Sequence, residues 1–214
     1  MAEPTLEKEW ALWQQGFALV AGLDEAGRGA WAGPVVAAAV ILPLDRPDLL
    51  TALQGVRDSK ELTPRQREEV FELIRKVALT IGVGVGSHTC IDRGNIISAT
   101  RHAMSQAIVN LKLPPHYLLI DALALPHLAT PQLAFPKADA LSLSVASASV
   151  VAKVTRDRLM ILLDQRYPGY QFARHKGYGT KAHRLALTAL GPCKIHRRSF
   201  APIKLLRKND VWLG

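Results

Sequence analysis

Four carboxylates interrupt or end apolar stretches of the chain. Asp24 and Glu25 follow the run ALVAGL, Asp121 follows YLLI, and Asp139 comes just before a long segment of helical character. Carboxylates rarely lie near a protein core unless they are paired or bound to a metal. If adjacent strands carry Asp24 and Asp121, the start of a helix can bring Asp139 close to both. Such ligands suit Mg²⁺ or Mn²⁺, and two such ions can promote hydrolysis of a phosphodiester.

Each of these acids also has an ordinary interpretation as a helix cap, a turn former or a surface charge, and Asp139 would suit the N-cap region of a helix. The pair Asp24 and Glu25 poses a geometric problem, because neighbouring residues of a regular strand point to opposite faces. Both can face one metal only where the strand breaks. We expect the following residues 26–29, AGRG, to supply that break.

Two glycine-containing segments could contact a nucleic acid. Gly27, Arg28 and Gly29 offer backbone amides with little steric cover, so the chain could approach a sugar edge while Arg28 anchors a phosphate. A plain turn between two strands is the alternative. Residues 174–180, RHKGYGT, place Tyr178 between glycines in a basic region. This setting is typical of an aromatic ring that stacks on a sugar or base, although Tyr178 could also be a packing residue.

The positive charge is concentrated in the C-terminal third of the chain. The 214 residues carry a net charge of +9, and residues 151–214 alone carry fourteen Lys or Arg against three Asp, a net charge of +11. The remaining residues are therefore slightly acidic. This distribution predicts that a polyanion binds the C-terminal third while a metal binds the acidic part. A solvated basic face without a partner is the alternative.

Several other classes of protein are disfavoured. The two cysteines, Cys90 and Cys193, lack the spacing of a zinc site or a disulfide framework, and we expect two reduced, buried thiols. The longest mainly apolar stretch, residues 30–44, contains Gly33 and Pro34 and falls short of the roughly 20 residues that span a membrane. The acidic N-terminus has the wrong charge for a secretory signal, so we expect a cytoplasmic protein.

The elements that must position the chemical groups can be predicted from hydrophobic periodicity. Residues 17–23, 35–42 and 81–87 resemble consecutive antiparallel strands, and residues 117–120 form a short strand that stops at Asp121. Helices are expected from Thr63-Pro64 through residue 77, over 95–111 and over 180–190. Residues 141–163 predict one long helix or two consecutive ones. This order indicates an α/β or α+β domain with a mixed sheet.

The order of these pieces resembles one enzyme family. Residues 22–29, GLDEAGRG, followed by residues 32–39, AGPVVAAA, closely resemble the opening signature of ribonuclease HII. The resemblance covers residues 17–203 and continues through five more segments: 58–60 (DSK), 120–121 (ID), 148–157 (ASVVAKVTRD), 176–180 (KGYGT) and 196–200 (HRRSF).

The resemblance implies a ribonuclease H-like α/β fold, with a central mixed sheet flanked by helices and a small C-terminal helical part. It implies an endonuclease that uses Mg²⁺ or Mn²⁺ to cut the phosphodiester 5′ to a ribonucleotide, leaving 3′-hydroxyl and 5′-phosphate ends. Its substrates would be RNA/DNA hybrids and duplex DNA that contains ribonucleotides. The family's catalytic and metal-binding acids fall on Asp24, Glu25, Asp121 and Asp139.

The family's substrate-binding residues fall on two glycine-containing segments and one polar loop. The element that contacts the ribose 2′-hydroxyl through its backbone falls on residues 27–29, and the stacking tyrosine falls on Tyr178. A phosphate-contacting loop falls on Ser59 and Lys60. The complete implied set is Gly27, Arg28, Gly29, Ser59, Lys60, Lys176, Tyr178 and Thr180.

The chain departs from the family pattern at three places, none of which removes a charged or reactive group. Ala30-Trp31 stands where proline and leucine are usual, and Ala122 stands where glycine is usual. Residues 145–147, VAS, replace a more alanine-rich stretch. Trp31 adds a ring beside the substrate loop, and packing under the hairpin is its ordinary interpretation. Residues 203–214 match nothing, and Trp212 could belong to a loose tail or a partner contact.

We expect an N-terminal extension over residues 1–16, a catalytic core over 17–167 and a basic substrate-binding part over 168–214, in a monomer. Two alternatives remain: a hybrid-binding module without catalysis, and a nuclease of the same fold that acts on branched DNA. The four acids speak against the first alternative. The elements at residues 27–29 and at Tyr178 speak against the second.

Overall fold

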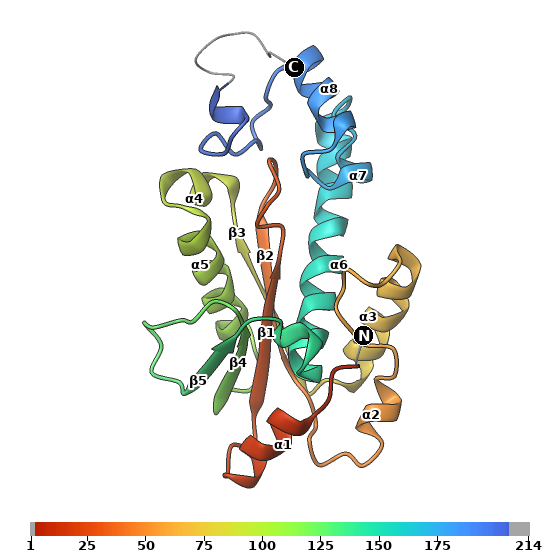
Figure 1. The fold of residues 1–214 in the computed structure, drawn as a ribbon, viewed down its shortest axis with the longest axis vertical. Helices are drawn as coiled ribbons and strands as arrows, with labels where there is room; N and C mark the ends of the chain where they lie inside the picture. The colour runs from red at the N-terminus through yellow and green to blue at the C-terminus, as the bar shows by residue number, and fades with distance from the viewer. Residues whose placement is uncertain (1–2, 206–214) are drawn as a thin grey trace.

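A mixed five-stranded sheet lies at the centre of the computed structural model, which describes residues 3–205 (Figure 1). The strand order is β3-β2-β1-β4-β5. Strands β1, β2 and β3 form an antiparallel meander, whereas β4 runs parallel to β1 and β5 runs parallel to β4. The bounds are β1 (Val20–Ala26), β2 (Val35–Ile41), β3 (Thr80–Gly86), β4 (Tyr117–Asp121) and β5 (Gln132–Phe135). The predicted mixed sheet is confirmed.

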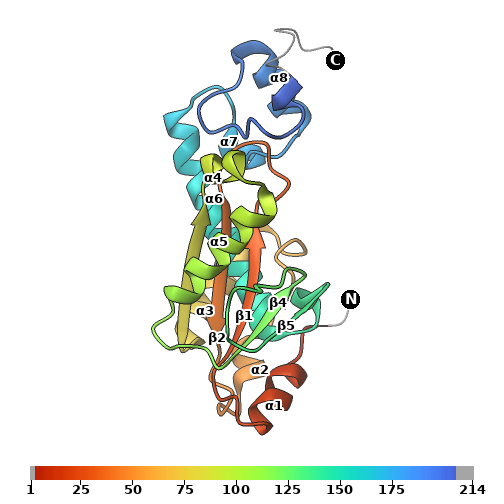
Figure 2. The ribbon, with the colours of Figure 1, turned by 90° about the vertical axis from the view of Figure 1, so that its left-hand side faces the viewer.

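Helices cover both faces of this sheet (Figures 1 and 2). Helix α5 packs on one face, and the 24-residue helix α6 packs on the other together with α3. The residues predicted as one long helix or two therefore form a single helix. The bounds are α1 (Glu7–Gln14), α2 (Leu49–Ala52), α3 (Pro64–Val77), α4 (His88–Arg93), α5 (Ile96–Val109), the 3₁₀ turn η1 (Ala138–Ala140), α6 (Leu143–Arg166), α7 (Phe172–His175) and α8 (Lys181–Leu190).

Local sequence explains where the helices begin. Thr63 caps α3 in a capping box with Gln66, and Pro64 occupies the first turn, as predicted. Thr180 caps α8 by accepting a hydrogen bond from the amide of His183. Strand β1 alternates in the usual way: Ala21 and Leu23 pack toward α5, and Val20 and Ala26 pack toward α6. Gly22 lets α6 approach closely, since a Cβ there would lie 2.1 Å from the carbonyl carbon of Ser144.

The C-terminal part has a small core of its own. Ala32, Met160, Phe172, Leu187 and Ile195 belong to this cluster, which also receives side chains of the β1–β2 connection and of α6. Helices α7 and α8 lie at the upper end of the molecule, beside the last turns of α6 (Figure 1). We call residues 168–205 the C-terminal lobe. The rest of the predicted 168–214 segment, with Trp212, lies outside the described residues.

The N-terminal segment packs on the main core. Leu6 is fully buried, and Glu9 in α1 is fully buried as well. A carboxylate oxygen of Glu9 accepts hydrogen bonds from the hydroxyl of Ser142 at 2.6 Å and from the amide of Ser144 at 2.9 Å. Residues 3–16 are thus tied to the start of α6.

Three sequence predictions need correction. Strand β1 does not break at Asp24 and Glu25 but stays paired with β2 through Ala26, because small buried alanines face it in the register. Strand β5 was not predicted, since it has only four residues and none of them is fully buried. Cys90 and Cys193 are free but half-buried rather than buried. In the described part of the chain, no helix is long and apolar enough to cross a membrane.

Candidate active site

Asp24 and Asp121 lie on neighbouring strands near the carboxyl ends of β1 and β4. Strands β1 and β4 pair in parallel with Leu23 opposite Ile120, so the next residues, Asp24 and Asp121, follow in register. Strand alternation points both toward the α6 face. Asp24 is 4% exposed. Burial, followed by the negative charges of Glu25 and Asp121, raises the pKa of Asp24 well above its usual value.

Glu25 occupies the other side of the pleat, because β1 remains regular at this point. Its carboxylate accepts from the guanidinium of Arg28 at 3.2 Å. Burial raises the pKa of Glu25, and the charge of Arg28 opposes that shift. Asp121 adds to the rise, so the charges of Glu25 and Asp121 act on each other across the edge of the sheet. The expected break is absent, so Asp24 and Glu25 start from opposite faces of β1.

Asp139 lies in η1, immediately before α6, and it faces a lysine. Lys60 Nζ is 3.4 Å from its carboxylate and 3.4 Å from that of Asp58. Burial and the charges of Asp58 and Asp121 raise the pKa of Asp139. Asp121 also accepts from the amide of Ala138 at 2.8 Å, which ties β4 to the turn that carries Asp139.

Ser59 and Lys60 have different environments. Ser59 is buried, and its hydroxyl accepts from the hydroxyl of Ser149 on α6 at 3.0 Å. The Lys60 side chain is 76% exposed, although it approaches Asp139. Ser59 therefore anchors the loop to α6, whereas Lys60 presents an exposed cation beside Asp139.

The four acids offer the donors that a divalent cation requires. Among residues 3–205, no three His, Cys, Asp or Glu side chains are close enough together to enclose a metal ion. Glu25 turns toward Arg28 and Asp139 toward Lys60. One carboxylate oxygen of Glu25 is nevertheless buried without a hydrogen-bond partner. Burial and neighbouring negative charges raise the pKa of Asp24, Glu25 and Asp139, and an unpaired carboxylate oxygen is buried among them, so the donor set fits a hard cation.

Two buried arginines hold the loop formed by residues 27–34. Arg197 donates to the carbonyls of Arg28 and Gly27 at 2.7 Å each and to that of Gly33 at 3.0 Å. Arg156 donates to the carbonyl of Pro34 at 2.9 Å. These bonds occupy carbonyls, and in the described structure no backbone carbonyl accepts from the amides of Arg28 and Gly29. The loop therefore presents N–H groups rather than carbonyls to a ligand.

Gly27 could not be replaced by a residue with a side chain. Its φ is +96°, and a Cβ would lie 1.9 Å from Nε of Arg156. Ala122 has a φ of +55°, which explains why glycine is usual there in the family it resembles. Trp31 does not pack under the hairpin as expected. It lies against Gly179 and the ring of His183 in the C-terminal lobe, with ring centroids 5.5 Å apart.

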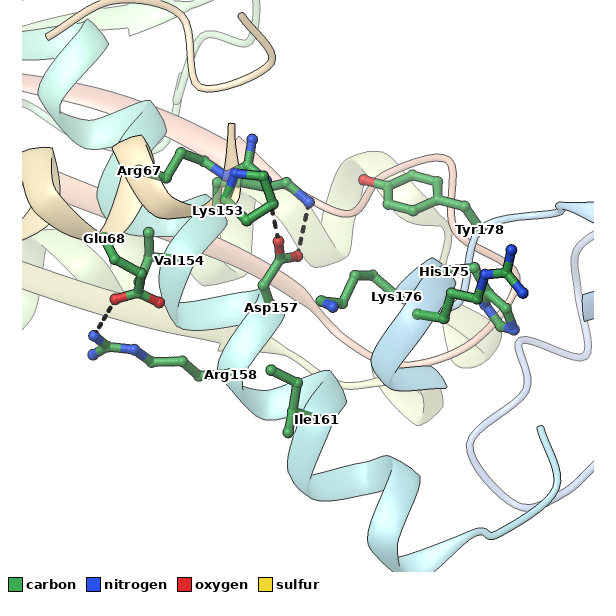
Figure 3. Close-up of a pocket in the computed structure, with 12 residues that line it drawn as sticks. Arg67, Glu68, Lys153, Val154, Asp157, Arg158, Ile161, His175, Lys176 and Tyr178 are labelled. Carbon is green, nitrogen blue, oxygen red and sulfur yellow. Dashed lines mark hydrogen bonds and ion pairs between the residues drawn. The ribbon is translucent and has the colours of Figure 1, made fainter. Parts of the chain in front are cut away.

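Tyr178 lines a cavity of about 340 Å³ between α3, α6 and the C-terminal lobe (Figure 3). The guanidinium carbon of Arg156 is 5.3 Å from the centre of its ring, and Lys153 Nζ is 5.8 Å away. Lys153 in turn binds Asp157 at 2.7 Å. The other basic side chains that line the cavity are Arg67, Arg158, Arg174 and Lys176, against the acids Glu68 and Asp157.

The remaining predicted substrate residues surround Tyr178. Lys176 lines the same cavity, and its ammonium also donates to the carbonyl of Ala173. Thr180 is exposed, and its hydroxyl serves as the cap of α8. Sequence reasoning assigned no role to Arg156 or Arg197. Both fall inside the segments 148–157 and 196–200 that carry the resemblance, but residue type alone does not reveal that they are fully buried.

Comparison with known proteins gives one consistent result. The family model for ribonuclease HII matches residues 21–203. A ribonuclease HII of Geobacter metallireducens is 54% identical over 191 residues, which cover 89% of this chain and 87% of that protein. A ribonuclease HII of Synechococcus sp. is 52% identical over 213 residues, 99% of this chain and 94% of that protein.

The fold gives the same answer. The crystal structure of ribonuclease H2 from Pyrococcus horikoshii superposes with a TM-score of 0.75 at 28% sequence identity, covering 89% of this chain and all of that one. The predicted ribonuclease H-like fold is therefore confirmed. The match extends over both the sheet that carries the acids and the lobe that carries Tyr178, and the chain belongs to the ribonuclease HII family.

Proposed function

We propose that this chain is a divalent-metal-dependent endonuclease that hydrolyses the phosphodiester 5′ to a ribonucleotide, in RNA/DNA hybrids or in duplex DNA with embedded ribonucleotides. The products are a 3′-hydroxyl and a 5′-phosphate. The observation that carries this proposal is the juxtaposition of the buried Asp24 and the half-buried Asp121 with a glycine loop in which the amides of Arg28 and Gly29 have no backbone acceptor among the described residues. A nuclease of this kind needs both a hydrolytic centre and a means of recognising ribose.

The acids supply the hydrolytic centre. Asp24, Glu25, Asp121 and Asp139 would hold Mg²⁺ or Mn²⁺, which neutralises charge on the phosphate and lowers the pKa of a bound water. Lys60 lies beside Asp139 and Asp58, so its ammonium stands at the edge where a phosphate would enter. An ammonium there can attract the negative charge of the substrate. Because the side chain is exposed, it can leave Asp139 and pair with a phosphate instead.

The glycine loop supplies recognition of the sugar. The 2′-hydroxyl is the backbone group that distinguishes RNA from DNA, and it can accept from a backbone N–H. Arg197 and Arg156 hold the loop rigidly through its carbonyls. A rigid loop places its amides at a fixed distance from the acids, so that a ribose sets the position of the cut.

The cavity at Tyr178 binds the nucleic-acid strand beside the ribonucleotide. Its five basic side chains against two acidic ones suit a phosphate backbone, and the ring can stack on a sugar or base. Base sequence should matter little, since every base offers a face for stacking. All of these groups come from one chain, and we propose that the protein acts as a monomer.

The test is a cleavage assay on a DNA duplex with a single embedded ribonucleotide. The protein with Mg²⁺ or Mn²⁺ should cut 5′ to the ribonucleotide and leave the expected end groups, whereas Asp24→Asn should bind the duplex and leave it intact. A duplex without a ribonucleotide is the control substrate. Binding without cleavage by the unaltered protein would favour a binding module. Cleavage of a branched, ribonucleotide-free DNA would favour the second alternative.

A further inference from the structure

Three histidines meet in the interior of the C-terminal lobe, away from the acids. His183 and His196 are fully buried, and His175 is 7% exposed. The rings of His175 and His183 stack with their centroids 4.4 Å apart. His183 Nε2 lies 3.0 Å from His196 Nε2, so the two rings share a hydrogen bond. Burial lowers the pKa of both residues to about 4, which keeps them neutral at physiological pH.

The hydrogen bonds of these rings permit one arrangement of protons. His196 Nδ1 lies 2.9 Å from the amide of Cys193, which can only donate, and 3.3 Å from the carbonyl of Cys193, which can only accept. The choice is made at the other end of the pair, because the carbonyl of Tyr178 can only accept from His183 Nδ1, so His183 Nε2 accepts and His196 Nδ1 must accept as well. The proton of neutral His196 then lies on Nε2 and is donated to His183 Nε2. His183 carries its proton on Nδ1, which donates to the carbonyl of Tyr178 at 3.0 Å.

This relay ends on the residue whose ring lines the basic cavity. The peptide groups around Tyr178 are held on both sides: its amide donates to the carbonyl of His175 at 3.0 Å, and the amide of Gly177 donates to His175 Nδ1 at 3.2 Å. The carbonyl of Gly177 accepts from the amide of Trp31 at 2.8 Å. The histidines thus connect the backbone of Tyr178 to the loop of residues 27–34.

We infer that His183 and His196 are positioning residues, which act through the carbonyl of Tyr178 to hold its ring in place for the substrate. This inference rests on the proposed function, in which Tyr178 grips the strand beside the ribonucleotide. A neutral imidazole suits the task because it accepts at one nitrogen and donates at the other across a rigid ring. Replacing either histidine by an apolar residue would leave buried polar groups of the relay without partners.

The proton arrangement is tested without substrate. Two-bond ¹H–¹⁵N correlation spectra of the labelled full-length protein at pH 7 report which nitrogen of each imidazole carries the proton. We expect the Nδ1–H form for His183 and the Nε2–H form for His196. A spectrum in which His183 carries its proton on Nε2, or in which either ring is charged at pH 7, overturns the relay.

The functional link is tested by a double-mutant cycle between His183→Leu and Tyr178→Ala. Both kcat/KM for a single-ribonucleotide duplex and Kd for the same uncut duplex in EDTA are measured. His183→Leu should weaken both roughly tenfold, the equivalent of about 1.4 kcal/mol. In the Tyr178→Ala background it should add little, because the ring that it positions is gone. If the losses of the two single variants instead multiply in the double variant, the inference is overturned.

Two further variants separate positioning from loss of stability. His183→Asn can still donate from near the Nδ1 position to the carbonyl of Tyr178, so it should recover most of the lost affinity. Leu187→Ala removes a buried side chain of the same lobe and should lower Tm without changing Kd. If Leu187→Ala weakens binding as much as His183→Leu at a similar Tm, a positioning role is wrong. If the unaltered protein binds the duplex but does not cleave it, only the proposed function is contradicted. The double-mutant cycle measured by Kd still tests whether the histidines position Tyr178.

Discussion

Asp24 shows how stability and activity oppose each other at a single residue. Its raised pKa means that the ionised carboxylate is less favourable in the folded protein than in the unfolded chain. Stability is therefore lost as pH rises from the ordinary pKa of the carboxyl through its raised value in the folded state. The ionised carboxylate is therefore a destabilising charge in the folded protein, and a bound cation would offset it.

We predict that Asp24→Asn raises the thermal stability of the metal-free protein at pH 7 while it abolishes cleavage. The amide keeps the shape of the side chain and removes a buried charge, with its desolvation cost and its repulsion from Glu25 and Asp121. Each kcal/mol relieved raises Tm by about 2–4 °C in a domain of this size. Calorimetry in EDTA measures the effect, and Asp45→Asn, at an exposed site, is the control. An unchanged or lower Tm would contradict the account of the site.

Tyr178 should act through its ring rather than its hydroxyl. Tyr178→Phe should retain much of the activity, whereas Tyr178→Ala should lose on the order of 1–3 kcal/mol of substrate interaction, the usual contribution of one stacked aromatic. The loss should be greatest on a single-ribonucleotide duplex, because a long hybrid offers many registers. Kinetics of both variants on both substrates test this prediction. Equal impairment by the two substitutions would instead identify the hydroxyl as the working group.

Sequence predicts most of the elements because their periodicity and caps are local. Thr63, Gln66 and Pro64 mark the start of α3 unambiguously, and the apolar run before Asp121 marks β4. Strand β5 escapes prediction because its pairing with β4 is made through the backbone, and a short edge strand needs no distinctive side chains.

The site is predictable in part for the same reason. Residue type and order single out the four acids and Tyr178, but the roles of Arg197 and His183 depend on burial and on partners more than ten residues away. The continuation of β1 through Ala26 is likewise set by its pairing with β2, which the glycines at positions 27 and 29 do not reveal.

At the level of elements, Arg197 joins the C-terminal lobe to the loop between β1 and β2. Arg197→Lys should lower kcat/KM at least tenfold, because a single ammonium cannot reproduce three bonds from a planar guanidinium to the carbonyls of Gly27, Arg28 and Gly33. The exposed neighbour Arg198→Lys is the matched control and should retain full activity. Near-normal turnover of Arg197→Lys would show that the loop needs no such support.

At the level of the whole molecule, charge and shape divide between the sheet and the C-terminal lobe. The lobe, with α7 and α8, stands at one end of the molecule, and its basic side chains reach the cavity beside α6 (Figures 1 and 3). The acids lie in the last residues of β1 and β4 and in η1. A duplex bound along this surface would place its phosphates on the lobe while one sugar reaches the glycine loop.

Affinity for uncut substrate in EDTA should therefore fall as salt rises, since neutralised phosphates release counterions. Arg174→Gln with Lys176→Gln should reduce the slope of log K against log salt by up to about 0.9 per lost contact. Lys112→Gln, beyond the far end of α5, is the control and should leave the slope unchanged. A salt-independent affinity would exclude the lobe as a phosphate-binding surface.

The strand order also determines when each strand can pair during synthesis on the ribosome. The meander of β1, β2 and β3 can form once residue 86 has emerged, but the other edge of β1 pairs only with β4, which begins at Tyr117. Synthesis proceeds at about 5–20 residues per second, so on the order of 5–20 s pass between the completion of β1 and the completion of β4. Throughout this interval the mainly apolar edge of β1 that later pairs with β4 is open to other chains. Newly made protein is therefore most vulnerable to aggregation before Asp24 and Asp121, on their two strands, first meet.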